Sequence, residues 1–127
     1  MVDDIVAHAR EEWPKECCGV VAAENGRATQ VYRAANAAKQ PNLGYLIEGI
    51  DLYRIWSDIE DRGWVLEAIY HSHPKSPAVP SQTDINLADQ WPDALYLIVS
   101  LEDQERPDLR GYRIVDGKVD EAQLAIS

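Results

Sequence analysis

The sequence predicts an α/β fold in which helices pack on a mixed β-sheet. Two observations carry this prediction. Apolar residues recur at helical spacing in two segments, while other segments are apolar runs of strand length. The turn dipeptides Asn25-Gly26 and Asp116-Gly117 each lie between two strand-like runs, as in a β-hairpin. The predicted order along the chain is therefore helix, hairpin, helix, strand, helix and final strands.

The first half of the chain opens with a predicted helix that ends just before Pro14. Residues 17–23 are typical of a buried strand, and residues 28–34 return as the second arm of the hairpin. Residues 35–44 contain Asn, Pro and Gly and are predicted to form a loop. The apolar stripe of the first helix consists of Val2, Ile5, Val6, Ala9 and Trp13.

The second half of the chain starts with a helix that has Asp51 near its start and Gly63 just past its end. The strand-like run that follows carries two histidines at its C-terminal end. A proline-rich loop then leads into a short helix that is stopped by Trp91-Pro92. The strand-like run spans residues 64–71 and the short helix about 82–90. Further strands are predicted at 94–101, 109–115 and 118–126.

Length and composition limit the class of protein. The length of 127 residues indicates a single domain over residues 1–127. The formal net charge of −10 disfavours binding to nucleic acid or to an anionic membrane, which generally requires a basic surface. No apolar run is long enough to span a bilayer, and the first residues lack the pattern of a secretory signal. Because Cys17 and Cys18 are adjacent, we expect no disulfide framework and a cytoplasmic protein in a reducing compartment.

The end of the central predicted strand holds a candidate metal site. His71 and His73 are two residues apart, so their imidazoles point to the same side of an extended strand. A loop with three prolines then allows Asp84 to fold back toward them. Two imidazoles and a carboxylate are suitable zinc ligands, and three protein ligands are typical of a catalytic zinc site. Bound Zn²⁺ lowers the pKa of a water molecule and polarises a substrate carbonyl.

Each candidate residue also has a purely structural interpretation. Ser81 and Asp84 match a variant of the capping box at the start of a helix. The third histidine, His8, lies off the apolar stripe of the first helix and is predicted to be a solvated surface residue. Strand alternation places Glu67 on the face of the two other histidines, as a weaker candidate for proton transfer. A Cys-His hydrolase is disfavoured, because a buried strand is a poor place for a reactive thiol.

The metal motif resembles the signature of the JAMM (MPN-plus) metalloprotease family. The signature is His-x-His, ten residues and Asp, with a serine three residues before the Asp, which here are Ser81 and Asp84. The resemblance covers nearly the whole chain, from Glu16-Cys17-Cys18-Gly19 to the apolar runs at 95–101 and 109–114. The metal motif is highly specific, and the flanking strands are moderately so.

The resemblance implies a role for each residue. His71, His73 and Asp84 would hold Zn²⁺. Glu16 precedes Cys-Gly, as the catalytic glutamate of the family does, and would take a proton from the attacking water and pass it to the leaving amine. Ser81 would stabilise the oxyanion that forms as the carbonyl is attacked.

The resemblance also implies a fold and a substrate. The fold would be the MPN (JAB1/MPN) domain, an α/β fold similar to that of cytidine deaminases. Family members hydrolyse amide bonds at the C-terminal Gly-Gly of ubiquitin or ubiquitin-like proteins, and the short chain is similar to the compact bacterial type that acts on ubiquitin-like sulfur-carrier proteins. Two alternatives are a non-catalytic MPN scaffold, which usually lacks one or more ligands, and a zinc peptidase that acts on small peptides.

Overall fold

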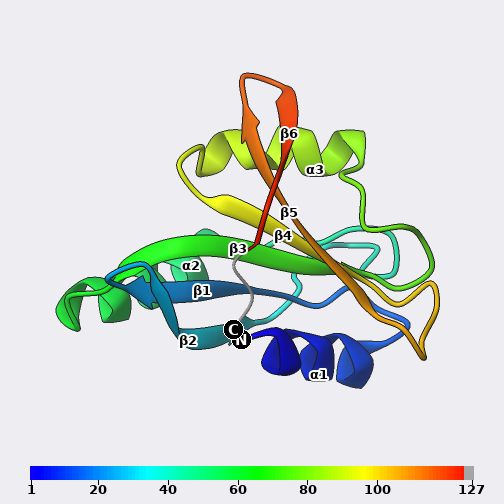
Figure 1. Ribbon diagram of the computed structural model, residues 1–127, viewed down its shortest axis with the longest axis horizontal. Coiled ribbons are helices and arrows are strands. Elements are labelled where there is room, and N and C mark those ends of the chain that lie inside the picture. Colours follow the sequence, from blue (N-terminus) through cyan, green and yellow to red (C-terminus); the bar gives the residue numbers. More distant parts are fainter. Residues whose placement is uncertain (125–127) are drawn as a thin grey trace.

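The computed structural model of the chain describes residues 1–124. In this range the strands form a six-stranded sheet in the order β2-β1-β3-β4-β5-β6, with helices on both of its faces (Figure 1). Neighbouring strands are antiparallel except β3 and β4, which are parallel, so the sheet is mixed as predicted. The elements are α1 (Val2–Glu12), β1 (Cys18–Glu24), β2 (Arg27–Ala34), α2 (Gly49–Asp61), β3 (Val65–His73), α3 (Gln82–Leu87), the 3₁₀ turn η1 (Ala88–Gln90), β4 (Leu95–Ser100), β5 (Asp108–Val115) and β6 (Lys118–Ala122).

Two tight turns join the predicted hairpins. Asn25 and Gly26, between β1 and β2, have φ angles of 51° and 80°. Asp116 and Gly117, between β5 and β6, have φ angles of 51° and 77°. Positive φ at both central residues is typical of a type I′ turn, whose twist matches that of the flanking strands. Both hairpins predicted from the turn dipeptides are therefore confirmed.

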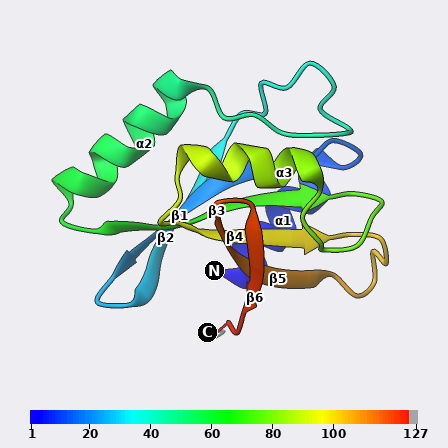
Figure 2. The same cartoon turned by 90° about the horizontal axis from the view of Figure 1, so that it is seen from above.

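Different helices cover the two faces of the sheet (Figure 1 and Figure 2). α2 and α3 pack on one face, over the larger of two apolar cores, and α1 packs on the opposite face. The larger core contains Val20, Ile59, Ile69, Ile98 and Ile114, and the core beneath α1 contains Ile5, Ala9, Val21, Leu97 and Val99.

Strand β3 lies between β1 and β4 and contributes residues to both faces. Ile69, His71 and His73 face α2 and α3, whereas Tyr70 and Ser72 face α1. The alternation continues to the last residue of the strand. Both histidines therefore point to the same side of the sheet, as the spacing predicted.

Glu67 is the extra residue of an irregularity in β3, and its direction differs from strict alternation. Val21 pairs with Ala68 and Ala22 pairs with Leu66, so Glu67 is left unpaired, as in a β-bulge. Glu67 instead lines a cavity on the α1 face of the sheet. The prediction that Glu67 shares a face with the histidines is therefore wrong, because strict alternation does not continue through the bulge.

The prediction of a solvated His8 is also wrong. His8 is only 3% exposed, and its Nδ1 lies 2.7 Å from the hydroxyl oxygen of Tyr70, a fully buried residue. A buried hydroxyl requires a hydrogen-bond partner, and α1 provides one by turning His8 inward beside Ile5 and Ala9. Burial lowers the pKa of His8 and so favours the neutral imidazole.

The other predicted elements are present with small differences at their ends. The helix predicted at 82–90 is divided into α3 and η1. β6 ends at Ala122, and Leu124 beyond it packs onto the core beneath α1, next to Gly111. Residues 125–126 of the predicted final strand lie outside the described residues. None of the helices within residues 1–124 is both long enough and apolar enough to cross a membrane.

Gly19 in β1 leaves no room for a side chain. A Cβ atom there would overlap the carbonyl oxygen of Tyr32 and the ring of Tyr70. We predict that Gly19→Ala lowers the free energy of unfolding by about 2–3 kcal/mol, because the added methyl group strains a packed core. In the control Gly44→Ala, the new Cβ meets no atom within 4 Å. Urea unfolding followed by circular dichroism measures both, and equal midpoints would contradict the prediction.

Candidate active site

Three side chains converge at the C-terminal end of β3. The Nε2 atoms of His71 and His73 lie 3.1 Å apart, and Asp84 Oδ2 lies 3.2 Å from the first and 3.1 Å from the second. All three residues are buried. Asp84 returns to β3 from the first turn of α3, after the proline-rich loop at residues 74–80. The structure thus brings together the three residues that the sequence predicted as metal ligands.

The spacing of these three atoms fits a small divalent cation. In a tetrahedral zinc site with ligand distances of about 2.0–2.1 Å, neighbouring ligand atoms are roughly 3.3 Å apart. Two imidazole lone pairs and a carboxylate oxygen repel one another at this distance unless a proton or a cation lies between them, and one proton cannot serve all three. A metal ion bound by all three atoms removes the repulsion, and these are ligand types that zinc accepts.

The two histidines are held in place by different contacts. His73 Nδ1 lies 2.8 Å from the carbonyl oxygen of Pro77, which can only accept, so Nδ1 carries the proton and Nε2 presents its lone pair to the site. His71 Nδ1 is buried and has no hydrogen-bond partner among the described residues. The ring of His71 stacks instead on Tyr45, with centroids 4.3 Å apart and planes inclined by 21°. Tyr45 lies just beyond the predicted loop, and no pattern in the sequence there predicted that it would contact a histidine of the site.

The proline-rich loop between β3 and α3 is fixed through its carbonyl groups. Four of them accept hydrogen bonds from side chains of β3, β4, β5 and the end of α1. An unpaired buried carbonyl group is costly, so these bonds define the path of the loop. The donors and acceptors are Trp13 Nε1 to Pro74 O (3.4 Å), Ser100 Oγ to Ser76 O (2.6 Å), His73 Nδ1 to Pro77 O (2.8 Å) and the Tyr112 hydroxyl to Ala78 O.

The capping box at the start of α3 is part of the same site. Ser81 Oγ accepts a hydrogen bond from the backbone N–H of Asp84 at 3.2 Å, and Asp84 Oδ2 accepts one from the backbone N–H of Ser81 at 2.9 Å. That Oδ2 atom is also the one that contacts both histidines. Ser81 is exposed, and its hydroxyl donates no hydrogen bond to the described part of the chain.

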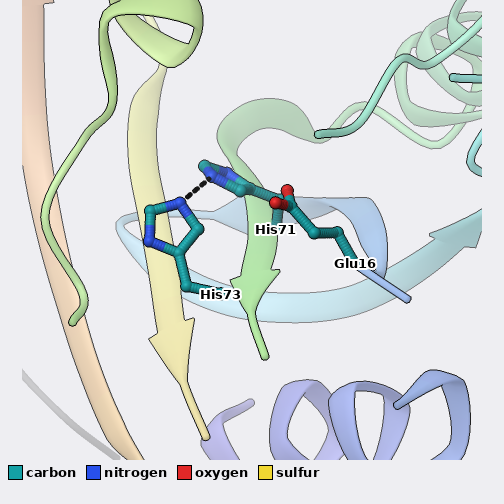
Figure 3. Close-up of side chains that lie close together, drawn as sticks. All are labelled: Glu16, His71 and His73. Carbon is teal, nitrogen blue, oxygen red and sulfur yellow. Dashed lines mark hydrogen bonds between the residues drawn. The ribbon is translucent and has the colours of Figure 1, made fainter. Parts of the chain in front are cut away.

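Glu16 lies two residues before β1, and its carboxylate points toward the histidines (Figure 3). Its backbone N–H donates to Pro41 O at 2.7 Å, and Asn36 Nδ2 donates to its carbonyl oxygen at 3.0 Å. Its Oε1 is buried without a hydrogen-bond partner within residues 1–124. Burial raises the pKa of Glu16 to about 7, with His73 opposing the increase and Asp84 adding to it. A carboxyl group with this pKa is suited to accept and return a proton near neutral pH.

The surroundings of Asp84 keep its carboxylate ionised. Burial alone would raise the pKa of Asp84, but its close contacts with the imidazoles of His71 and His73 outweigh burial and hold that pKa well below its usual range. Burial also lowers the pKa of His71. For His73, burial acts in the same direction, but its contact with the Asp84 carboxylate and its hydrogen bond to Pro77 outweigh burial and raise the pKa. Asp84 is therefore anionic at neutral pH, as a metal ligand must be.

A second group of three residues could also hold a metal ion. Glu16, His71 and His73 each offer one ligand atom within 4.8 Å of the others. The distances favour Asp84 as the third ligand, because its oxygen lies within 3.2 Å of both Nε2 atoms, whereas Glu16 forms no hydrogen bond to either histidine. With Asp84 as the third ligand, Glu16 would be left free to accept a proton, which is the role that the sequence predicted for it.

The two cysteines are unsuited to nucleophilic catalysis. Cys17 belongs to the core beneath α1 and Cys18 to the core on the other face, and both are buried. Burial raises the pKa of Cys17 to about 11 and that of Cys18 to about 12, so both are thiols near neutral pH. The structure therefore argues against a Cys-His hydrolase.

Comparison with known proteins supports the family resemblance. Residues 1–115 match the family described as prokaryotic homologues of the JAB domain. The CysO-cysteine peptidase of Mycobacterium tuberculosis (strain ATCC 25618 / H37Rv) is 42% identical over 128 residues, which cover 99% of this chain and 86% of the relative. The desampylase of Haloferax volcanii is 38% identical over 104 residues, which cover 77% of this chain and 74% of the relative.

Solved structures show the same fold. A protein from Desulfitobacterium hafniense matches with a TM-score of 0.85 and 31% identity, over 96% of this chain and 85% of that protein. A JAB1/MPN domain protein from Archaeoglobus fulgidus matches with a TM-score of 0.63 and 18% identity, over 97% of this chain and 90% of that protein. These matches confirm the MPN fold predicted from the sequence. The chain therefore belongs to the family of prokaryotic homologues of the JAB domain.

Proposed function

We propose that this protein is a zinc-dependent hydrolase that cleaves the amide bond after the C-terminal Gly-Gly of a ubiquitin-like sulfur-carrier protein. The observation that carries the proposal is the convergence of three proposed ligand atoms at 3.1–3.2 Å, near Oε1 of Glu16, which has no hydrogen-bond partner within residues 1–124. Three protein ligands and a separate proton acceptor are the parts that a catalytic zinc site requires.

The metal would be held by Nε2 of His71, Nε2 of His73 and Oδ2 of Asp84. Bound zinc supplies a water molecule of lowered pKa and polarises the substrate carbonyl. The protein contributes the fixed positions of the ligands. The stacking of Tyr45 on the face of the His71 ring and the hydrogen bond from His73 Nδ1 to Pro77 orient the two rings toward one point.

Glu16 is the general base in this proposal. Its Oε1 has no competing hydrogen bond among the described residues, and burial raises its pKa to about 7. Glu16 takes a proton from the attacking water as the water oxygen bonds to the carbonyl carbon. The carbon–nitrogen bond then breaks, and Glu16 passes the proton to the leaving amine nitrogen.

Ser81 is the proposed donor to the oxyanion that develops on the carbonyl oxygen. The bond from the backbone N–H of Asp84 fixes the position of Ser81 Oγ and leaves the hydroxyl proton free to donate. One well-placed donor of this kind lowers the reaction barrier by about 3 kcal/mol.

The substrate class is inferred from the family and from the named relatives. One relative that aligns with 99% of this chain is named CysO-cysteine peptidase, and another is named desampylase. The resemblance to the compact bacterial members implies a carrier whose Gly-Gly tail bears a cysteine or a few extra residues. These names support hydrolysis of a bond to a carrier protein.

Two alternative functions make different predictions. A non-catalytic scaffold would usually lack one of the ligands, whereas this chain has all three proposed ligands close together, with Glu16 near the two histidines and Ser81 joined to Asp84 by the capping box. A zinc peptidase for small peptides would use the same site, so the choice between the two hydrolases depends on the substrate.

Zinc content tests the metal site. We expect about one zinc ion per wild-type chain and much less in His73→Ala, because the variant lacks one of the three protein ligands. His8→Gln changes a buried histidine on the other face of the sheet and should retain its zinc. Elemental mass spectrometry of the folded, dialysed proteins gives these values. A folded wild type that binds no zinc, even when zinc is added back, would rule out the proposal.

Substitution of Glu16 tests the general base. We expect Glu16→Gln to keep its zinc but to lower kcat by about 100-fold or more, because the amide cannot accept the proton. Glu67→Gln removes a carboxylate from the opposite face of β3 and should leave kcat unchanged. Steady-state cleavage of a carrier fusion measures both variants. Full activity in Glu16→Gln would show that another group takes the proton.

The choice of substrate separates the two hydrolases. We expect kcat/KM for a folded ubiquitin-like carrier, extended by one residue after Gly-Gly, to exceed that for a free peptide of the same tail by about 100-fold or more, because the folded body adds binding energy. Mass spectrometry of the products identifies the cleaved bond. Equal values for the carrier and the peptide would instead indicate a peptidase for small peptides.

A further inference from the structure

The loop between β2 and α2 is organised around the side chain of Asn36. Its Nδ2 donates to the carbonyl oxygens of Glu16 and Gly44, both at 3.0 Å. Its Oδ1 accepts from the backbone N–H groups of Ala38 at 3.0 Å and Leu46 at 3.1 Å. A side-chain amide has two donor hydrogens and two acceptor lone pairs, so every one of them is used. One side chain thus connects the segment before β1 with distant positions of the loop.

These bonds fix the backbone of two residues that face the candidate site. Glu16 is held at its carbonyl oxygen by Asn36 and at its N–H by the carbonyl oxygen of Pro41, at 2.7 Å. Gly44 and Leu46, the residues before and after Tyr45, both form backbone hydrogen bonds with the Asn36 side chain. Although Glu16 and Tyr45 are far apart in the sequence, one amide sets the backbone position of both.

Tyr45 gives His71 the orientation that a hydrogen bond gives His73. The ring of Tyr45 is 7% exposed and stacks on His71 with centroids 4.3 Å apart. Nδ1 of His71 has no hydrogen-bond partner in the described part of the chain, whereas Nδ1 of His73 is bonded to a carbonyl oxygen. Packing against Tyr45 therefore restricts rotation of the His71 ring.

We propose that Asn36 is a positioning residue that sets the carboxylate of Glu16 and, through Tyr45, the ring of His71 as one hydrogen-bonded unit. The inference rests on the proposed function, because it concerns the geometry of the general base and of a metal ligand. Asn36 itself touches neither the reacting atoms nor the ligand atoms. Contacts of this kind behind a metal ligand typically change metal affinity or activity by about 10–100-fold.

Asn36→Asp is the test substitution, because it keeps the shape and the acceptor but turns an oxygen toward the carbonyl groups of Glu16 and Gly44. We expect a loss of zinc affinity of about 10-fold or more, a lower kcat with little change in KM, and an altered visible spectrum of the cobalt-substituted protein. Asn42→Asp makes the same change at an exposed position of the same loop and should leave all three unchanged. A folded Asn36→Asp with wild-type zinc affinity, kcat and cobalt spectrum would overturn the proposal.

Two substitutions of Tyr45 test the link to His71 separately. Tyr45→Phe keeps the stacked ring and should keep the wild-type zinc affinity and cobalt spectrum. Tyr45→Leu removes the ring and should lower the zinc affinity and alter the cobalt spectrum, as Asn36→Asp does. If Tyr45→Leu behaves as the wild type, the proposed link between Asn36 and the metal ligand is wrong.

A measurement on the unaltered protein covers the case in which Asn36→Asp does not fold. The side-chain amide protons of Asn36, observed by NMR, should exchange with solvent more slowly than those of Asn42, because both amide protons of Asn36 are hydrogen-bonded. Equal exchange rates would overturn the proposal. Failure of the proposed function has a different signature, since the wild type itself would then bind no zinc and cleave no carrier.

Discussion

The register of β3 is the constraint on which both cores and the candidate site depend. A shift of one residue would move both histidines of the candidate site to the α1 face of the sheet. Two contacts on that face oppose the shift: the Tyr70 hydroxyl is bound to His8, and Ser72 Oγ accepts from the backbone N–H of Cys17 at 2.8 Å. The core beneath α1 therefore keeps His71 and His73 on the other face of the sheet, although this core lies away from the candidate site.

The candidate site is built from groups that lower the stability of the fold. The Nε2 atoms of His71 and His73 and Oδ2 of Asp84 lie at repulsive distances, and Oε1 of Glu16 is buried without a partner in the described residues. A buried unpaired polar group costs about 1–3 kcal/mol. In the surrounding loops, by contrast, the polar groups are paired: four carbonyl groups of residues 74–80 and all donors and acceptors of the Asn36 amide are hydrogen-bonded. Ordered loops thus supply the rigidity that such a site requires.

The features that could be predicted from the sequence depend on local geometry. The Asn25-Gly26 hairpin and the common direction of the two ligand histidines follow from backbone rules that act over a few residues. The features that could not be predicted depend on distant contacts. Glu67 lies on the other face because it is the unpaired residue of a bulge in β3. His8 turns inward because the buried hydroxyl of Tyr70 needs a hydrogen-bond partner. Asn36 is a common loop residue, and nothing in its neighbours reveals that it connects two distant segments.

The capping box of α3 has a consequence for the evolution of the family. Ser81 and Asp84 satisfy each other's backbone N–H groups, and a helix cap of this kind stabilises a protein by about 1 kcal/mol whether or not any reaction occurs. A descendant that lost its activity would therefore still be selected to keep both residues. Nothing in the core favours two facing imidazoles or a buried, unpaired Glu16 for stability alone. In a chain of this fold without activity, stability would thus preserve the Ser-x-x-Asp pair but not Glu16 or the two histidines, so the capping pair alone is no sign of a working site.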